Sequence, residues 1–348
     1  MDAPVTVIVV NFNGGDTLLR CMRCLAAQTL VPERIDVIDN GSSDGSVERL
    51  EAALAAAPAV ARAAAHEAER EADRPDADLA HIAGRVAIDR VGRNIGFAAA
   101  NNRGLARCAT PLVALLNADA FAEPEWLERL CAAAGEYASA TSFGSRQMLE
   151  GEPGVIDGLG DVYHVSGLPW RARHRQRLEP ADLAPCEIFS PCAAAALYRT
   201  DAVRAVGAFD EDYFCYSEDV DLGFRLRLAG HSSRYVPDAV VHHVGSATSG
   251  HRHSDTVVYY GHRNLVWTLA KDMPLALMPL AIPAHIAMTA VSLVTLTRRG
   301  QFRVFCRAKR DALRGLPRAL RKRGSVQRSR RAGATDIWRA VSVGWSRG

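Results

Sequence analysis

A regular alternation of strand and helix signals in the first third of the chain constrains the fold more than any other feature. Val5–Val10 is a run of six residues, VTVIVV, that predicts a fully buried strand. Further strands are predicted at Arg34–Asp39, Arg85–Asp89 and Leu112–Leu116, and helices at Thr17–Gln28, from Val47 onward, at Phe97–Cys108 and at Glu125–Ala134. This order predicts an α/β fold with a doubly wound, mainly parallel, Rossmann-like sheet.

The rest of the chain gives weaker signals. Cys192–Tyr198 and Arg234–Val241 are expected to be strands, and Asp201–Val206 and Asp219–Ala229 helices. Ser139–Pro185 is rich in glycine and contains the basic loop Arg171–Arg177, which favours a substrate-facing excursion. Glu51–Gly84 is rich in Ala, Arg and Glu and is interpreted as an exposed, partly mobile helical insertion without chemistry of its own.

Polar residues stand where the predicted strands end. They are Asn11 and Asn13, then Asp39 and Asn40, then Asn117 and Asp119. Ligands of such sheets bind beyond the carboxyl ends of the strands, so these side chains are expected at the site. No G-x-G-x-x-G or G-x-x-x-x-G-K-[ST] run follows the first strand, which argues against a dinucleotide site and excludes a P-loop. Carboxylates and amides suit a base, a ribose or a metal instead.

Six segments, in order from about Val5 to about Asn264, resemble the inverting family 2 glycosyltransferases of GT-A fold, and within them the bacterial rhamnosyltransferase-like branch. These segments are VTVIVVNFNGG, VIDNGSSDGS, RNIGFAAANNRG, LLNADA, VGAFDEDYFCYSEDVDLGFRLRLAG and VVHHVGSATSG. Each motif alone is weak, but six in this order form a specific pattern.

The resemblance implies a role for each matching residue. Asp39 would contact the nucleobase, Asp44 would help to hold the nucleoside, and Asn94, Gly96 and Asn101 would line the sugar-nucleotide pocket. Asp119 would meet a divalent cation, Mg²⁺ or Mn²⁺, on the diphosphate, and His242 would complete the metal or diphosphate site. In the pair Glu218-Asp219, Asp219 would be the general base.

The chemistry explains these residue types. The departing nucleoside diphosphate needs charge neutralisation, which a hard cation on a carboxylate supplies. The attacking hydroxyl must lose its proton to a carboxylate on the opposite face of the sugar. Two positions depart from the family pattern: Asn117 replaces the first carboxylate of the D-x-D element, and Ser190-Pro191-Cys192-Ala193 replaces a small Gly-Ala turn.

Structural roles compete with these functional ones. Asp39 could form a strand-end turn, Asp119 could cap a helix, and Glu218 and Asp219 could cap the helix that follows them. A zinc site among the later histidines is disfavoured because no H-E-x-x-H motif is present. Cys21 and Cys24 form a lone C-x-x-C and are assigned to core packing.

The C-terminal region has a distinct charge pattern. Residues 298–331 contain fourteen Lys or Arg and one acid, a balance of +13, and the residues after 331 add +1. Because the whole chain carries +3, the first 297 residues carry −11. Met273–Thr297 is free of Asp, Glu, Lys and Arg over 25 residues. One span would place its flanks on opposite sides, so an in-plane or re-entrant segment followed by an amphipathic basic helix on an anionic membrane is favoured.

Two alternatives for this region stay open: a buried core helix with a solvated tail, and a tail that binds nucleic acid. No aromatic residues interleave the arginine run, which argues against nucleic acid as a partner. Eight cysteines do not indicate a disulfide scaffold, and the N-terminal residues lack a signal-peptide pattern, so a cytoplasmic location at the inner face of the membrane is expected.

The sequence thus predicts a glycosyltransferase domain at 1–265 with the insertion at 51–84, an apolar membrane-associating segment at 266–297 and a basic tail at 298–348. Its expected partners are a nucleoside-diphosphate-sugar donor, with deoxythymidine-diphosphate-rhamnose favoured, and a glycan or lipid-linked acceptor in polysaccharide synthesis. A nucleotidylyltransferase and a catalytically silent membrane-bound assembly partner are the alternatives. The latter is motivated by Asn117, and activity with and without EDTA would distinguish it from the enzyme.

Overall fold

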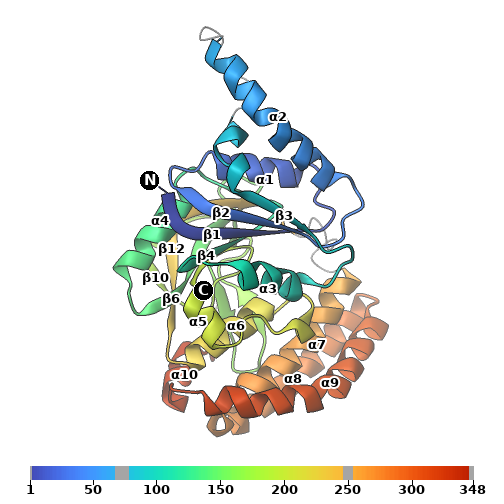
Figure 1. Cartoon of the computed structure of the whole chain (residues 1–348). Helices are drawn as coiled ribbons and strands as arrows, with labels where there is room; N and C mark the ends of the chain where they lie inside the picture. The colour runs from blue at the N-terminus through green and yellow to red at the C-terminus, as the bar shows by residue number, and fades with distance from the viewer. Residues whose placement is uncertain (1, 67–77, 246–253, 345–348) are drawn as a thin grey trace.

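A ten-stranded mixed sheet forms the centre of this computed structural model, which describes residues 2–66, 78–245 and 254–344 (Figure 1). Its strands are β1 (Asp2–Asn11), β2 (Val31–Asp39), β3 (Val86–Arg90), β4 (Leu112–Asn117), β5 (Ala120–Ala122), β6 (Ala140–Leu149), β7 (Ile156–Gly158), β10 (Cys186–Ile188), β11 (Ala195–Arg199) and β12 (Ser232–His243). Their order is β10-β12-β6-β11-β4-β1-β2-β3, with β5 beside β12 and β7 beside β6. A two-stranded sheet of β8 (Asp161–Tyr163) and β9 (Pro169–Arg171) stands beside it.

The parallel half of the sheet confirms the predicted alternation. β1 pairs in parallel with both β2 and β4, and β2 with β3. The register sets Asn11 beside Asp39 and Val10 beside Asn117, so the polar strand ends lie level with one another. One edge of the sheet therefore collects the residues that follow three strands.

The other half contains a strand that the sequence pattern missed. β6 lies between β11 and β12, within the stretch expected to be a substrate-facing excursion. The sequence of β6 lacks the apolar run that is typical of a buried strand, because several of its residues are polar. One of them, buried Ser142, forms a side-chain hydrogen bond with Ser233 of β12 at 2.7 Å. A buried strand can carry hydroxyls when each finds a partner in the neighbouring strand.

Helices cover both faces of the sheet (Figure 1). One face packs against α1 (Thr17–Ala26), α2 (Ser46–His66) and α4 (Trp126–Glu136) in the larger apolar cluster. The other packs against α3 (Phe97–Arg107), α5 (Thr200–Ala205) and α6 (Glu218–Leu228). This two-sided cover is what a doubly wound sheet requires.

The predicted insertion, Glu51–Gly84, extends away from the sheet over only part of its length (Figure 1). α2 extends away from the sheet in Figure 1, and residues 67–77 of the insertion lie outside the described residues. After them, Leu79 and Ile82 are fully buried in the cluster beneath α1. The end of the insertion therefore belongs to the core, contrary to the expectation of an exposed segment throughout.

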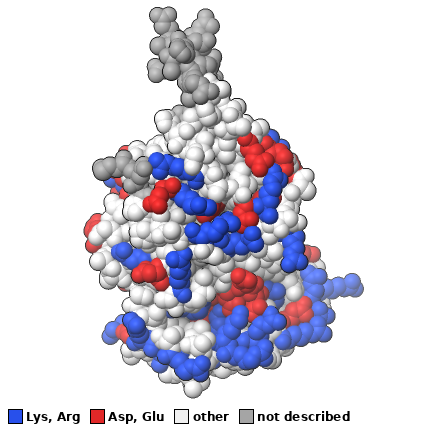
Figure 2. Space-filling model, viewed as in Figure 1, with Lys and Arg blue, Asp and Glu red and all other residues white. Residues whose placement is uncertain are grey.

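Three long helices form a layer beneath α6: α7 (Asp255–Asp272), α8 (Met278–Arg298) and α9 (Phe302–Arg328), followed by the short α10 (Ala334–Ala340) (Figure 1). The expected boundary between 265 and 266 falls inside α7. α9 packs along α7, where it buries Phe305, Ala308 and Ala312 and where the Trp267 indole donates to the Ala312 carbonyl at 2.8 Å. The basic region is thus part of the fold, and its Lys and Arg residues gather over this layer in Figure 2.

The apolar helix α8 differs from a core helix. Leu275–Arg298 has a mean hydropathy of 1.8 in its most apolar window, yet only 17% of that window is buried. Ile286 and Val291 are 64% and 66% exposed. The alternative of a buried core helix is therefore wrong.

Candidate active site

A single cavity of about 740 Å³ opens at the carboxyl edge of the parallel strands and continues to the α7–α8 layer. Its lining includes seven of the residues predicted from the sequence: Asn40, Asn94, Gly96, Asn117, Asp119, Glu218 and Asp219. Its size is within the range of small-ligand sites in proteins.

Hydrogen-bonded side-chain and backbone amides line the cavity at the ends of the parallel strands. Asn40 donates to the Asn94 side-chain oxygen at 3.0 Å, and that oxygen also accepts from the Gly96 N–H at 2.9 Å. Gly96 has φ +89°, and a Cβ there would lie 2.6 Å from Phe214. Only glycine combines this backbone with that close approach.

The other predicted nucleotide residues support this end from outside the lining. Asp44 accepts from the Gly15 N–H at 2.7 Å, and Asp39 accepts from the Ser42 N–H at 3.1 Å. The Asn11 amide donates to two serine hydroxyls, the Asn13 oxygen accepts from the Ser43 N–H, and Asn101 bonds the Phe97 carbonyl. These bonds fix the loops between strand and helix.

The second histidine of the His242-His243 pair faces the site. His243 is buried, with Nε2 3.3 Å from Asp119 and Nδ1 2.8 Å from Asp157. Burial opposes charge on this ring, but the two carboxylates outweigh it and raise the pKa of His243 to about 9. His242 instead lies 3.0 Å from Glu123 on the surface, so His243, and not the predicted His242, is the histidine that faces Asp119. Strand alternation is the reason, since His243 shares a face with buried Val241.

Two other carboxyl groups, those of Asp161 and Glu218, lie near the predicted base Asp219. Asp219 begins the first turn of α6 and accepts from the Ala193 N–H at 3.1 Å. Burial, followed by the charge of Asp219, raises the pKa values of Asp161 and Glu218 well above their ordinary values. A raised pKa disfavours the charged carboxylate that a general base requires, so Asp219 is a better candidate for the base than Asp161 or Glu218.

The loop that leads into α6 has an unusual backbone. Phe214, Tyr216 and Ser217 all have φ near +65°, a conformation that non-glycine residues adopt only when the surroundings enforce it. Asn264 of α7 enforces it by donating to the carbonyls of Tyr213, Cys215 and Tyr216. This strain is concentrated immediately before Glu218 and Asp219, the predicted catalytic pair.

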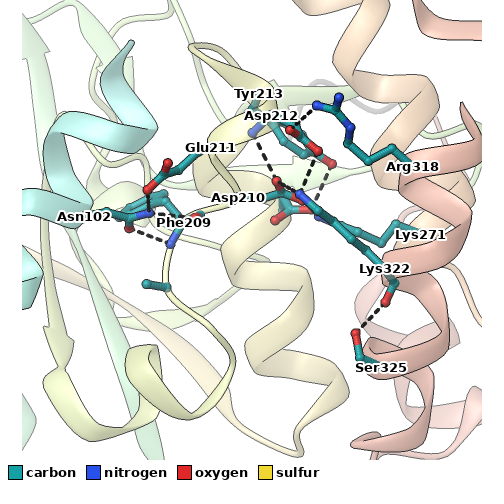
Figure 3. A network of polar contacts seen from close by, with 12 residues as sticks. Asn102, Phe209, Asp210, Glu211, Asp212, Tyr213, Lys271, Arg318, Lys322 and Ser325 are labelled. Carbon is teal, nitrogen blue, oxygen red and sulfur yellow. Dashed lines mark hydrogen bonds and ion pairs between the residues drawn. The ribbon is translucent and has the colours of Figure 1, made fainter. Parts of the chain in front are cut away.

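Charged residues of α9 and α7 brace the start of the same loop (Figure 3). Lys322 contacts both Asp210 and Asp212, Arg318 contacts Asp212 at 2.7 Å, and Lys271 contacts Asp210 at 2.6 Å. The basic helix α9 therefore helps to position the loop that leads into α6.

Four residues of the site were not predicted: Asp157, Asp161, Arg171 and His243. Arg171 pairs with Asp157 and lines the cavity beside Asp161. Arg171 begins the basic loop expected to face substrate, so part of the signal was present. Asp157 and Asp161 lie in a glycine-rich stretch whose pattern identifies no strand.

The side chains of Asp119 and His243 fit a hard divalent cation that takes most of its ligands from the substrate. Asp119 offers a carboxylate, and His243 would offer an imidazole nitrogen once a cation displaced the Nε2 proton, while Asp157 holds the other ring nitrogen, as in many metal sites. Within residues 2–66, 78–245 and 254–344, no group of three or more His, Cys, Asp or Glu is arranged as a ligand set. Mg²⁺ and Mn²⁺ are commonly bound by one or two protein groups and substrate phosphates.

Comparison with known proteins then decides the family. Residues 3–258 match the family described as "Glycosyltransferase like family 2". The chain belongs to this family. It is 29% identical over 299 residues to an N-acetylglucosaminyl-diphospho-decaprenol L-rhamnosyltransferase of Mycobacterium tuberculosis, which covers 75% of this chain and 85% of the relative. This glycosyltransferase is also 35% identical over 149 residues to a pre-mycofactocin glycosyltransferase of the same species, over 42% of this chain and 30% of that one.

Solved structures confirm the GT-A fold. GalNAc-T7 with UDP, GalNAc and Mn²⁺ aligns with a TM-score of 0.56 at 15% identity, over 77% of this chain and 47% of that chain. A mannosyltransferase of Pyrobaculum calidifontis, in complex with GDP-Man and Mn²⁺, aligns with a TM-score of 0.51 at 14% identity over 97% and 88%. The family match, and not these structures, makes the chain an inverting, nucleotide-sugar-dependent glycosyltransferase and decides against a nucleotidylyltransferase.

Proposed function

We propose that this glycosyltransferase moves rhamnose from deoxythymidine-diphosphate-rhamnose to a lipid-linked acceptor at an anionic membrane surface. The supporting observation is one continuous cavity that connects Asn40 and Asn94 at the strand ends, through Asp119 and Asp219, to Leu296 of the exposed apolar helix. The mycobacterial relative, by its name, acts on a lipid diphosphate with L-rhamnose, which favours this donor and acceptor.

In the proposed reaction, Asp219 accepts the proton of the acceptor hydroxyl as that oxygen attacks the sugar carbon. The Ala193 N–H holds the carboxylate in place at 3.1 Å. A divalent cation, when bound at Asp119 and His243, would neutralise charge on the departing diphosphate. Asp157 keeps the His243 ring in the orientation that this requires.

The proposed membrane contact uses α8 in the plane of the membrane. α7 and α9 pack side by side (Figure 1), and α8 lies between them in the sequence. If α8 spanned a bilayer, α7 and α9 would lie on opposite sides of it and could not pack together, which favours the in-plane arrangement. Its apolar side chains, such as Ile286 and Val291, are exposed. Arg310 and Arg314 of α9 are 56% and 68% exposed and would meet anionic headgroups.

A panel of nucleotide sugars tests the donor. Ligand binding to the folded state raises the melting temperature, and deoxythymidine-diphosphate-rhamnose should raise it more than UDP- or GDP-sugars at equal concentration. Product analysis with a short-chain lipid-linked acceptor should then show rhamnose transfer with inversion. A larger shift and faster transfer with a UDP- or GDP-sugar would contradict the donor assignment.

A further inference from the structure

The cavity ends at the α7–α8 layer, next to a group of basic side chains that the reaction does not use. His262 and Arg299 line this end, together with apolar Leu265 and Leu296. The His262 ring lies 5.1 Å from the Phe305 ring, and the Lys309 ammonium lies 5.5 Å from the centre of the same ring. The three long helices thus bring potential cations to the end of the cavity that faces the apolar helix.

Two of these basic groups, Lys309 and His262, have a buried nitrogen without a hydrogen-bond partner among the described residues. Within the part of the chain that the structure describes, neither Lys309 Nζ nor His262 Nδ1 has a hydrogen-bond partner, and both atoms are shielded from solvent. The remaining neighbour, His285, bonds the Ser166 carbonyl at 2.8 Å and offers no negative charge. Burying an ammonium without a counter-charge is costly, so such a group indicates a missing anion.

The pKa values agree with an incomplete site. Burial lowers the pKa of Lys309 to about 8. Burial, followed by repulsion from Lys309 and His285, lowers the pKa of His262 to about 4. An anionic ligand would reverse both effects by favouring the charged forms.

We propose that Lys309 and His262 bind the diphosphate of the lipid-linked acceptor, between its sugar at Asp219 and its chain along α8. The proposal rests on the proposed function, because the acceptor class comes from there. The four-carbon stem of Lys309 allows its ammonium to turn toward the cavity. Arg299, on the lining at the same end, supplies a further positive charge.

Calorimetric binding of farnesyl diphosphate, which has a diphosphate and an apolar chain but no sugar, tests this site. Lys309→Met should weaken binding about 10- to 100-fold, the usual value of a charge-assisted hydrogen bond, while Lys309→Arg should retain most of it. Arg328→Met removes an exposed charge from the C-terminal end of the same helix and should change the affinity less than about twofold. Lys309→Met should melt no lower than the wild type, since it removes an unpartnered buried charge.

Short-chain phosphatidylglycerol distinguishes an acceptor diphosphate from a membrane headgroup. The proposal predicts that Lys309→Met lowers the affinity for farnesyl diphosphate far more than the affinity for this phospholipid. Equal binding of farnesyl diphosphate by the wild type and Lys309→Met, or loss of phospholipid binding alone, would overturn the site. Failure of the proposed function would appear separately, as a wild-type protein that deoxythymidine-diphosphate-rhamnose does not stabilise.

Discussion

The ammonium of Lys322 lies 2.7 Å from the carboxylate of Asp212, across 110 positions of the chain. The contact joins the basic helix α9 to the loop that leads into Glu218 and Asp219, the proposed catalytic pair (Figure 3). A C-terminal region expected from its charge to be a separate tail therefore supports the candidate active site. Truncation after Asp272 would remove this support together with any membrane contact.

Asp212→Asn should lower the free energy of unfolding by about 0.5–1 kcal/mol at pH 7, a modest value because Arg318 and Lys322 are partly exposed. Burial opposes ionisation of Asp212, but its two basic partners outweigh it and lower its pKa. The stabilisation is complete above the ordinary Asp pKa of about 3.9 and is lost as the pH falls through the lowered value. Urea unfolding at several pH values should show the wild-type advantage disappearing in acid. Exposed Asp238→Asn is the control, and a pH-independent difference would contradict the assignment.

The packing of α9 on α7 depends on Gly315. A Cβ there would lie 2.3 Å from the Trp267 ring, whereas a Cβ at Gly324, on the same helix, meets only an arginine end at 3.6 Å. Gly315→Ala should therefore destabilise the protein by about 1–3 kcal/mol. Gly324→Ala should stabilise it by up to about 1 kcal/mol through helix propensity. Thermal unfolding measures both, and equal effects would show that α9 is not packed as described.

The sequence predicted the parallel half of the sheet because its strands, such as Val5–Val10, are apolar runs with a clear period. It missed β6, where buried hydroxyls such as Ser142 satisfy one another across strands. That pairing depends on the tertiary register, which no local pattern contains.

The candidate site likewise contains residues that the sequence predicted and residues that it missed. Residues at strand ends, such as Asn40 and Asp119, were predicted because topology alone brings strand ends together. The sequence pointed to His242, whereas in the structure His243 faces Asp119, because alternate residues near the end of β12 point to opposite faces of the sheet. Asp157 lies in β7 and Arg171 in β9, two short strands whose placement depends on contacts far away in the sequence.

The two adjacent histidines offer a matched test of metal binding. With deoxythymidine diphosphate present, His243→Ala should weaken Mn²⁺ binding by about 10- to 100-fold, whereas His242→Ala should leave it unchanged. Electron paramagnetic resonance of free Mn²⁺ measures both. A loss of affinity in His242→Ala alone would restore the assignment made from the sequence.

Membrane association should depend on the exposed side of α8. Replacing Ile286 and Val291 together by Glu should release the protein from anionic vesicles in sedimentation without lowering its melting temperature, because both side chains are exposed. Two Glu residues at exposed Ala55 and Ala56 of α2 make the same charge change and should have little effect. High salt should weaken the contribution of α9. Vesicle binding that persists in the α8 variant would place the contact elsewhere.

The central claim is that Asp219 deprotonates the acceptor during sugar transfer, and Asp219→Asn tests it most directly. Under saturating deoxythymidine-diphosphate-rhamnose and acceptor, the rate should fall by about 10²–10⁴-fold, the usual contribution of a general base, while donor affinity holds. Glu218→Gln should cost less, because burial and the charge of Asp219 raise the pKa of Glu218 and so disfavour the charged form that a base needs. Near-full turnover by Asp219→Asn at unchanged donor affinity would contradict the account and place the base elsewhere.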